Sequence, residues 1–133
     1  MSEKDALQNP RVIVIQKLYG HHLNKQSELN FPKHRYKKFI KDVVNGTIER
    51  KDLIQDIIDT ELREDINENK TELMLKLMIM AAIYEFMFMH KTPKNVIINE
   101  YIKVADFFVQ ESQKSFLNAI LEKISKVSRI KNE

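Results

Sequence analysis

The sequence of 133 residues contains no cysteine, only two glycines and only three prolines. Without cysteine, disulfide bonds, cysteine-ligated zinc sites and thiol nucleophiles are excluded, and a reducing compartment such as the cytoplasm fits. The scarcity of glycine and proline argues against a fold of short strands and tight turns. We therefore expect an all-α fold, in which helices joined by polar connections form a single domain over residues 1–133.

Long uninterrupted apolar runs are also absent. The most apolar stretch, residues 73–89, contains Lys76 and Glu85, so it is too short and too charged to be expected to span a membrane. The N-terminal stretch MSEKDALQNPR is polar and lacks the apolar core of a signal peptide. These features predict a cytoplasmic protein with no membrane association.

Motifs for catalysis or metal binding are not found in the sequence. Gly20 and Gly46 stand alone, so neither a phosphate-binding loop nor a nucleophile elbow can be built around them. His21 and His22 are neighbours, and neighbouring helical positions do not share a face, whereas a helical metal site needs an i, i+4 pair. We expect no enzymatic activity, no cofactor and no metal site.

Charge is unevenly distributed along the chain. Residues 1–50 carry a net charge of +5, residues 51–72 carry −5 and residues 73–133 carry +3. The segment KHRYKKFIK, residues 33–41, contains Lys33, Arg35 and Lys37 close to Tyr36. It is either the solvated face of an amphipathic helix or a patch that contacts RNA phosphates. A helix lying on a membrane surface is a third option, but core packing explains its apolar stripe better.

Apolar residues recur with a helical period along nearly the whole chain. Asn9 followed by Pro10 is a start signal, and Asn45-Gly46 followed by Thr47 predicts a helix stop and then a new N-cap. Residues 73–89 are apolar on nearly all sides, which indicates a central helix surrounded by others. The expected helices cover about 10–24, 32–45, 47–62, 71–90, 93–109 and the residues after a break at 110–112, with a further short helix around 62–67.

Glu85 is a single carboxylate in this apolar helix, and a carboxylate removed from water needs a partner. One interpretation is an internal ion pair, for example with a lysine of the helix that follows Pro93. The other is that Glu85 reaches the surface near the end of its helix and meets a basic group of another protein.

Three segments together resemble the NusB family of bacterial transcription antitermination factors. They are PRVIVIQKLYGHHLN at 10–24, AAIYEF followed by PKNVIINEYIKVADFF between 81 and 108, and SFLNAILEKISK at 115–126. The segments cover about half of the chain, in the order and spacing of the family. The resemblance implies about seven helices in two sub-bundles around a central apolar helix, without catalytic activity.

The same resemblance implies partners and binding residues. NusB-like proteins pair with NusE, a small ribosomal-subunit protein, and the pair binds boxA RNA in the antitermination complex of RNA polymerase. Tyr19 and Glu85 match the residues that the family places against NusE. Arg11 matches an RNA-contacting arginine, and Glu122 matches an acidic position on the RNA-facing surface of the last helix.

The chain departs from the family pattern before its first expected helix. The family usually has several consecutive arginines there, whereas this chain offers only Lys4 and Arg11. Fewer phosphate contacts predict weaker and less salt-dependent RNA binding. Two alternatives remain: a stand-alone RNA-binding domain related to the N-terminal domain of ribosomal RNA cytosine methyltransferases, and a homodimer that masks its RNA surface until NusE arrives.

Overall fold

The computed structural model describes residues 3–66 and 71–131, and within those ranges the regular structure is entirely helical. The predicted all-α fold class is thus confirmed. The helices are α1 (Glu3–Gln8), α2 (Pro10–Leu23), α3 (Lys37–Glu49), α4 (Lys51–Glu61), α5 (Leu73–Phe88), α6 (Lys94–Phe108) and α7 (Glu111–Lys131).

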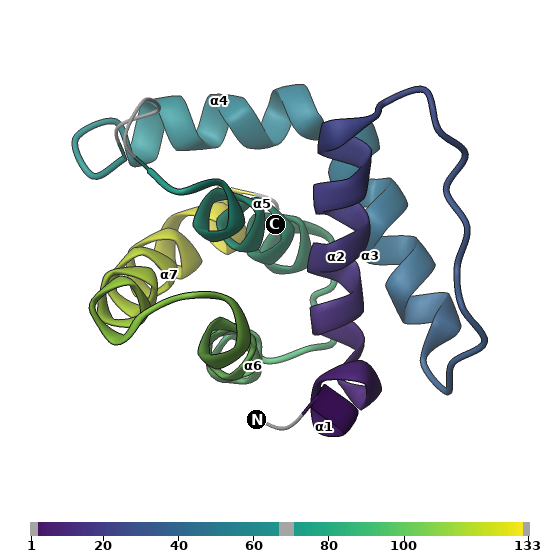
Figure 1. Ribbon diagram of the computed structural model, residues 1–133. Helices are drawn as coiled ribbons and strands as arrows, with labels where there is room; N and C mark the ends of the chain where they lie inside the picture. The colour runs from purple at the N-terminus through teal and green to yellow at the C-terminus, as the bar shows by residue number, and fades with distance from the viewer. Residues whose placement is uncertain (1–2, 67–70, 132–133) are drawn as a thin grey trace.

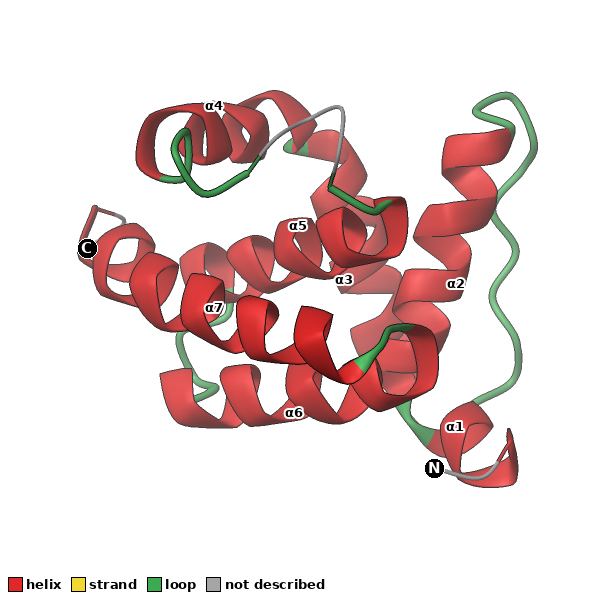
Figure 2. Cartoon of the chain, turned by 60° about the vertical axis from the view of Figure 1, so that its left-hand side comes forward, coloured by secondary structure: helices red, strands yellow, loops and turns green. Residues whose placement is uncertain are grey.

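Helix α5 occupies the centre of the bundle, as predicted. It contacts α2, α3, α4, α6 and α7, and every residue from Leu77 to Met87 is buried. In Figure 1, α2 and α3 lie on one side of α5, α6 and α7 lie on the other, and α4 crosses above. Figure 2 shows α5, α6 and α7 stacked roughly along one direction. A helix buried on all sides explains why this stretch has no polar face.

Helix α2 begins where the sequence predicted. The side chain of Asn9 accepts a hydrogen bond from the backbone N–H of Arg11 at 3.0 Å, and Pro10 occupies the first helical position. This cap satisfies one of the free amides of the first turn, and proline has no amide to satisfy there. The helix therefore starts at a fixed residue, which also fixes the direction of the Arg11 side chain.

The predicted start of the next helix at Pro32 is wrong, because α3 begins at Lys37. Residue Phe31, which precedes the proline, has no side-chain acceptor that could cap a helix. Instead, His34 Nδ1 accepts a hydrogen bond from the backbone N–H of Tyr36 at 2.9 Å, and the chain turns there. Residues 33–36 therefore form an irregular approach to α3 and not its first turn.

The predicted helix stop at Gly46 and the predicted cap at Thr47 are also wrong. Both residues lie inside α3, and no glycine in the described part of the chain has a positive φ. Gly46 serves packing instead, since an added Cβ would collide with the ring and hydroxyl oxygen of Tyr84 in α5. The hydroxyl of Tyr84 donates a 2.7 Å hydrogen bond to Asp42, one turn earlier in α3, which holds the ring against the glycine.

Two other features depart from the expected helices. The short helix α1 was not predicted, since its only buried side chain is that of Ala6. The helix expected around 62–67 is absent over residues 62–66, and residue 67 lies outside the described ranges. Of the helices described, none has the length and apolar character needed to cross a membrane.

Candidate functional site

Glu85 lies in the interior of the bundle, and its side chain is fully buried. Arg11 of α2 donates to both of its carboxylate oxygens, from Nε at 3.0 Å and from a terminal guanidinium nitrogen at 2.6 Å. The hydroxyl of Tyr101 in α6 donates a third hydrogen bond, at 2.5 Å. We call Arg11, Glu85 and Tyr101 the buried triad. It joins the three helices α2, α5 and α6.

The expectation that Glu85 reaches the surface is therefore wrong. The alternative, an internal ion pair, is what the structure contains, but its cation is Arg11 and not a lysine of α6. The capped start of α2 places the guanidinium opposite the last turn of α5. A bidentate arginine satisfies both carboxylate oxygens, which a lysine cannot do.

The surroundings of the triad keep its members in the required protonation states. Burial opposes the charge of Arg11, but the hydrogen bond and the negative charge of Glu85 outweigh it and raise the pKa of Arg11. Burial, reinforced by the charge of Glu85, raises the pKa of Tyr101 well above its ordinary value. The ring of Phe39 in α3 covers the guanidinium of Arg11, and the ring centroid lies 4.8 Å from Arg11 Cζ. Arginine thus remains a cation and tyrosine remains a donor.

Arg11 was also expected to contact RNA, and the structure places it largely inside the fold, with 8% of its surface exposed. It lines a hollow of about 520 Å³ that we call the Arg11 hollow. The other residues around this hollow are Asp5, Gln8, Asn9, Pro10, Tyr36, Phe39 and Glu100. Since the guanidinium already donates to both carboxylate oxygens of Glu85, a phosphate in this hollow would compete with an existing carboxylate.

The basic residues of segment 33–41 have a different environment. Lys33, Arg35 and Lys37 are exposed, as is Lys4 on α1. A second hollow of about 440 Å³, the α1 hollow, lies between this segment and α1, and it is lined by Leu7, Gln8, Lys33, His34, Arg35 and Tyr36. The structure thus brings the segment beside the N-terminal helix. Figure 1 shows the long connection descending from α2 to the lower end of α3, near α1.

Tyr36 is a feature of this surface that the sequence did not reveal. Its helical spacing from Phe39 and Ile40 is that of an apolar stripe, but 46% of its surface is exposed and it borders both hollows. The guanidinium of Arg35 lies over its ring, 5.4 Å from the centroid. An exposed aromatic ring next to cations is the kind of surface on which unstacked RNA bases bind. The helical period alone could not show this, because the helix starts one residue later.

Tyr19 and Glu122, the other two candidates, are both at the surface. Tyr19 lies on α2 with 37% of its surface exposed, so it is not a core residue. Glu122 is exposed on α7 and lines neither of the two hollows described above. The candidate residues therefore fall into four groups: the buried pair Arg11 and Glu85, a basic surface beside α1, a tyrosine on α2, and an acidic position on α7.

Comparisons with known proteins agree with this architecture. The family model described as "NusB family" matches residues 8–126. A transcription antitermination protein NusB from Oceanobacillus iheyensis is 35% identical over 92 residues, which are 69% of this chain and 72% of that protein. The NusB protein of Bradyrhizobium sp. (strain ORS 278) is 28% identical over 91 residues, 68% of this chain and 54% of the relative. The chain thus spans about half the length of several curated relatives.

A solved structure shows the same fold. It is the NusB of T. maritima, with a TM-score of 0.79, 23% sequence identity and coverage of 92% of each chain. The family match extends over most of the sequence and includes the three segments quoted above. This chain belongs to the NusB family.

Proposed function

We propose that this chain is a non-enzymatic, cytoplasmic transcription antitermination factor that binds NusE and the boxA RNA of nascent ribosomal RNA transcripts. Three properties of the relatives support the proposal: their family, their fold and their names as transcription antitermination proteins. The observation that carries it in this molecule is the exposed basic surface beside α1, in which Lys33, Arg35 and Tyr36 line one hollow.

This surface replaces the missing arginines. The family pattern has an arginine-rich stretch before the first long helix, and this chain has Lys4 there and a buried Arg11. Segment 33–41 lies against the same helix α1 and supplies Lys33, Arg35 and Lys37 as phosphate contacts. Tyr36 adds an aromatic face for a base. RNA affinity in this protein is therefore expected to depend on the segment after α2 more than on the N-terminus.

Tyr19 is the proposed contact to NusE. A tyrosine that is partly exposed on a rigid helix offers a large apolar face and a hydroxyl, which is typical of interface anchors. Glu85 does not reach that surface, so its contribution to NusE binding is indirect: through the buried triad it holds α2 against α5 and α6.

The test is fluorescence anisotropy with a labelled boxA oligonucleotide, with and without NusE, at about 50 and about 200 mM salt. We expect weak, salt-sensitive binding by the protein alone and tighter binding with NusE. The double substitution Lys33→Glu/Arg35→Glu should weaken binding at least about tenfold and reduce the salt slope by about two. Lys91→Glu is the matched control, because Lys91 lies in the α5–α6 connection, away from α1 in Figure 2.

The outcomes separate the alternatives. Equal RNA affinity with and without NusE would contradict the cooperative model. An equal loss in the Lys91→Glu control would show that only net charge matters and not the surface beside α1. Co-purification with a ribosomal RNA methyltransferase, and with no ribosomal protein, would favour the alternative of a stand-alone RNA-delivery domain.

A further inference from the structure

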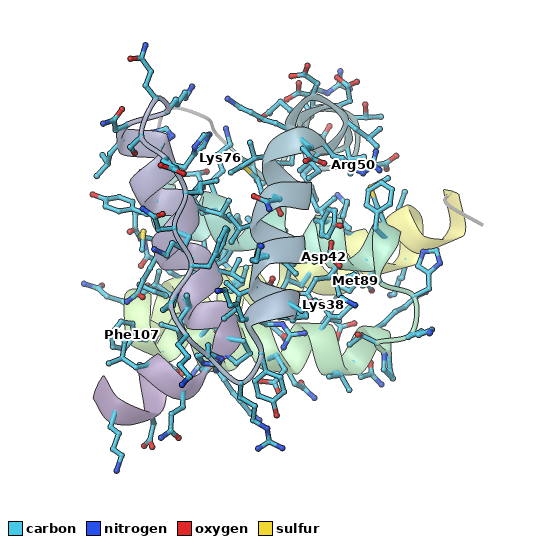
Figure 3. All side chains as sticks on the ribbon, turned by 90° about the vertical axis from the view of Figure 1, so that its right-hand side faces the viewer. Lys38, Asp42, Arg50, Lys76, Met89 and Phe107 are labelled. Carbon is cyan, nitrogen blue, oxygen red and sulfur yellow. The ribbon has the colours of Figure 1, made fainter. Side chains whose placement is uncertain are left out.

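A third cavity, of about 490 Å³, lies at the opposite end of α2 from the triad. We call it the α4 cavity. It is formed by the last turns of α2 and α3, the first two turns of α4 and the N-terminal half of α5. Figure 3 shows Lys76 of α5 at this end of the molecule, between the upper end of α2 and the helices α3 and α4. Its volume is in the range of cavities that bind small molecules.

The side chains around the α4 cavity have one sign of charge. Its floor is apolar and includes Leu18, Leu77 and Met80, whereas its rim carries the amines of Lys25, Lys51 and Lys76 and two imidazoles. Among the residues that the structure describes, no aspartate or glutamate lines it.

This is notable because α4 belongs to the most acidic part of the chain. Lys51 and Gln55, one turn apart, face the cavity, while Asp52 and Asp56 of the same helix do not line it. Such an arrangement of charge attracts an anion.

Two buried polar atoms of the cavity wall have no hydrogen-bond partner in the described part of the chain. They are Oγ1 of Thr47, a residue with 2% of its surface exposed, and Nδ1 of His21. Nearly all buried polar groups in proteins are hydrogen-bonded, so a pair of unpartnered atoms in the wall of one cavity needs an explanation. A hydroxyl and an imidazole can both donate to an anionic oxygen.

We propose that the α4 cavity binds a phosphorylated small molecule with an apolar body, of the size of a mononucleotide. Lys25, Lys51 and His21 would hold the phosphate, Thr47 would donate to one of its oxygens, and the floor of leucine and methionine side chains would cover the apolar body. This site is separate from the proposed RNA surface, since α2 is roughly 20 Å long and the two lie at its opposite ends.

The experiment is isothermal titration calorimetry of the full chain with AMP, inorganic phosphate and adenosine at about 150 mM salt, which screens weak non-specific attraction. We expect AMP to bind at least about tenfold more tightly than phosphate or adenosine, because only AMP engages both the cations and the apolar floor. AMP binding no tighter than that of either fragment would overturn the proposal.

Variants assign the binding to this cavity. Lys51→Gln and Thr47→Val should each weaken AMP binding by about three- to tenfold, in the range of one lost hydrogen bond. Thr47→Val removes a hydroxyl that has no partner in the fold, so its melting temperature should not fall. Lys91→Gln is the control and should bind AMP as the parent chain does. Unchanged AMP affinity in both cavity variants would refute the assignment.

A competition experiment separates this site from the RNA surface. AMP should not displace labelled boxA RNA, and Lys33→Glu/Arg35→Glu should bind AMP with unchanged affinity. Displacement of RNA by AMP at concentrations that saturate the calorimetric site would place the nucleotide on the RNA surface and overturn the proposal.

Discussion

Replacing Glu85 by glutamine tests whether the buried triad is structural. The substitution keeps the size and shape of the side chain but removes its charge. Arg11 would then hold a cation in the interior with only a neutral amide oxygen beside it, since its side chain is 10% exposed and Glu85 is its ion-pair partner. Arg11 cannot release its proton to escape this cost, because the pKa of a guanidinium lies far above neutral pH.

The magnitude follows from the geometry. Removing one partner of a buried ion pair typically costs about 3–5 kcal/mol, because the remaining charge stays desolvated. The glutamine oxygen can still accept one hydrogen bond, so we expect the lower end, about 3 kcal/mol. For a chain of this size, 1 kcal/mol corresponds to roughly 3–5 °C in melting temperature, and the expected decrease is therefore about 10–15 °C.

The assay is thermal and urea unfolding followed by circular dichroism, with Glu28→Gln as a control on an exposed carboxylate. The triple variant Arg11→Met/Glu85→Leu/Tyr101→Phe removes all three polar groups together and should recover most of the lost stability, as apolar replacements of buried pairs commonly do. A loss in Glu85→Gln no larger than in the control would refute the reasoning. So would a triple variant less stable than Glu85→Gln, because the cost would then come from packing and not from an unpaired charge.

The remaining predictions concern glycine packing, high pH and the partner surface. Gly46→Ala should lower the free energy of unfolding by about 1–3 kcal/mol, because the added Cβ would collide with Tyr84. Gly20→Ala should raise the free energy of unfolding by about 0.5–1 kcal/mol, because the space around Gly20 is open and alanine is the better helix former. Urea titration measures both changes. Burial and the hydrogen bond to Asp42 raise the pKa of Tyr84 from 10.0 to about 12. Because the folded state retains this proton, the contribution of Tyr84 to stability is complete below about pH 10 and is lost as the pH rises towards 12. The urea midpoints measured at pH 9 and at pH 11 should therefore differ less in Tyr84→Phe than in the parent chain. An equal difference in the two proteins would contradict the assignment. Tyr19→Ala should weaken NusE binding about tenfold without lowering the melting temperature, whereas Tyr36→Ala should weaken RNA binding only; surface plasmon resonance with NusE distinguishes them.

Elements with a strong helical period could be predicted from the sequence. The capped start of α2 and the central position of α5 followed from Asn9-Pro10 and from the unbroken apolar run. The stop at Gly46 was wrong because glycine also permits close packing, and its partner Tyr84 lies in another helix that local sequence cannot locate. A glycine in an amphipathic stripe can either end a helix or allow close packing, and the sequence alone does not decide between the two.

The sequence predicted that Glu85 needs a partner, but it did not predict which residue that partner is. A lone carboxylate in an apolar helix required a partner, and an internal ion pair was one of the two interpretations. Its cation lies 74 residues away, so that no spacing rule connects them. The family resemblance favoured the surface for Glu85, and the structure shows how a residue at a family position can instead be held by its own chain.

Helix α3 connects the buried triad to the basic surface beside α1. An experiment can therefore separate the structural role of the triad from the RNA-binding role of that surface. Phe39, which covers the guanidinium of Arg11, belongs to the first turn of α3, and Tyr36 at the start of that helix borders the same hollow. Loosening Arg11 by Glu85→Gln should therefore also disturb the start of α3 and weaken RNA binding, together with a loss of stability. Lys33→Glu/Arg35→Glu changes only exposed groups, two charges and the contact of Arg35 with the exposed ring of Tyr36, so it should weaken RNA binding with the melting temperature nearly unchanged. If both variants lost RNA affinity with no change in stability, Glu85 would act at the RNA surface itself, and the buried triad could not be the reason for its effect.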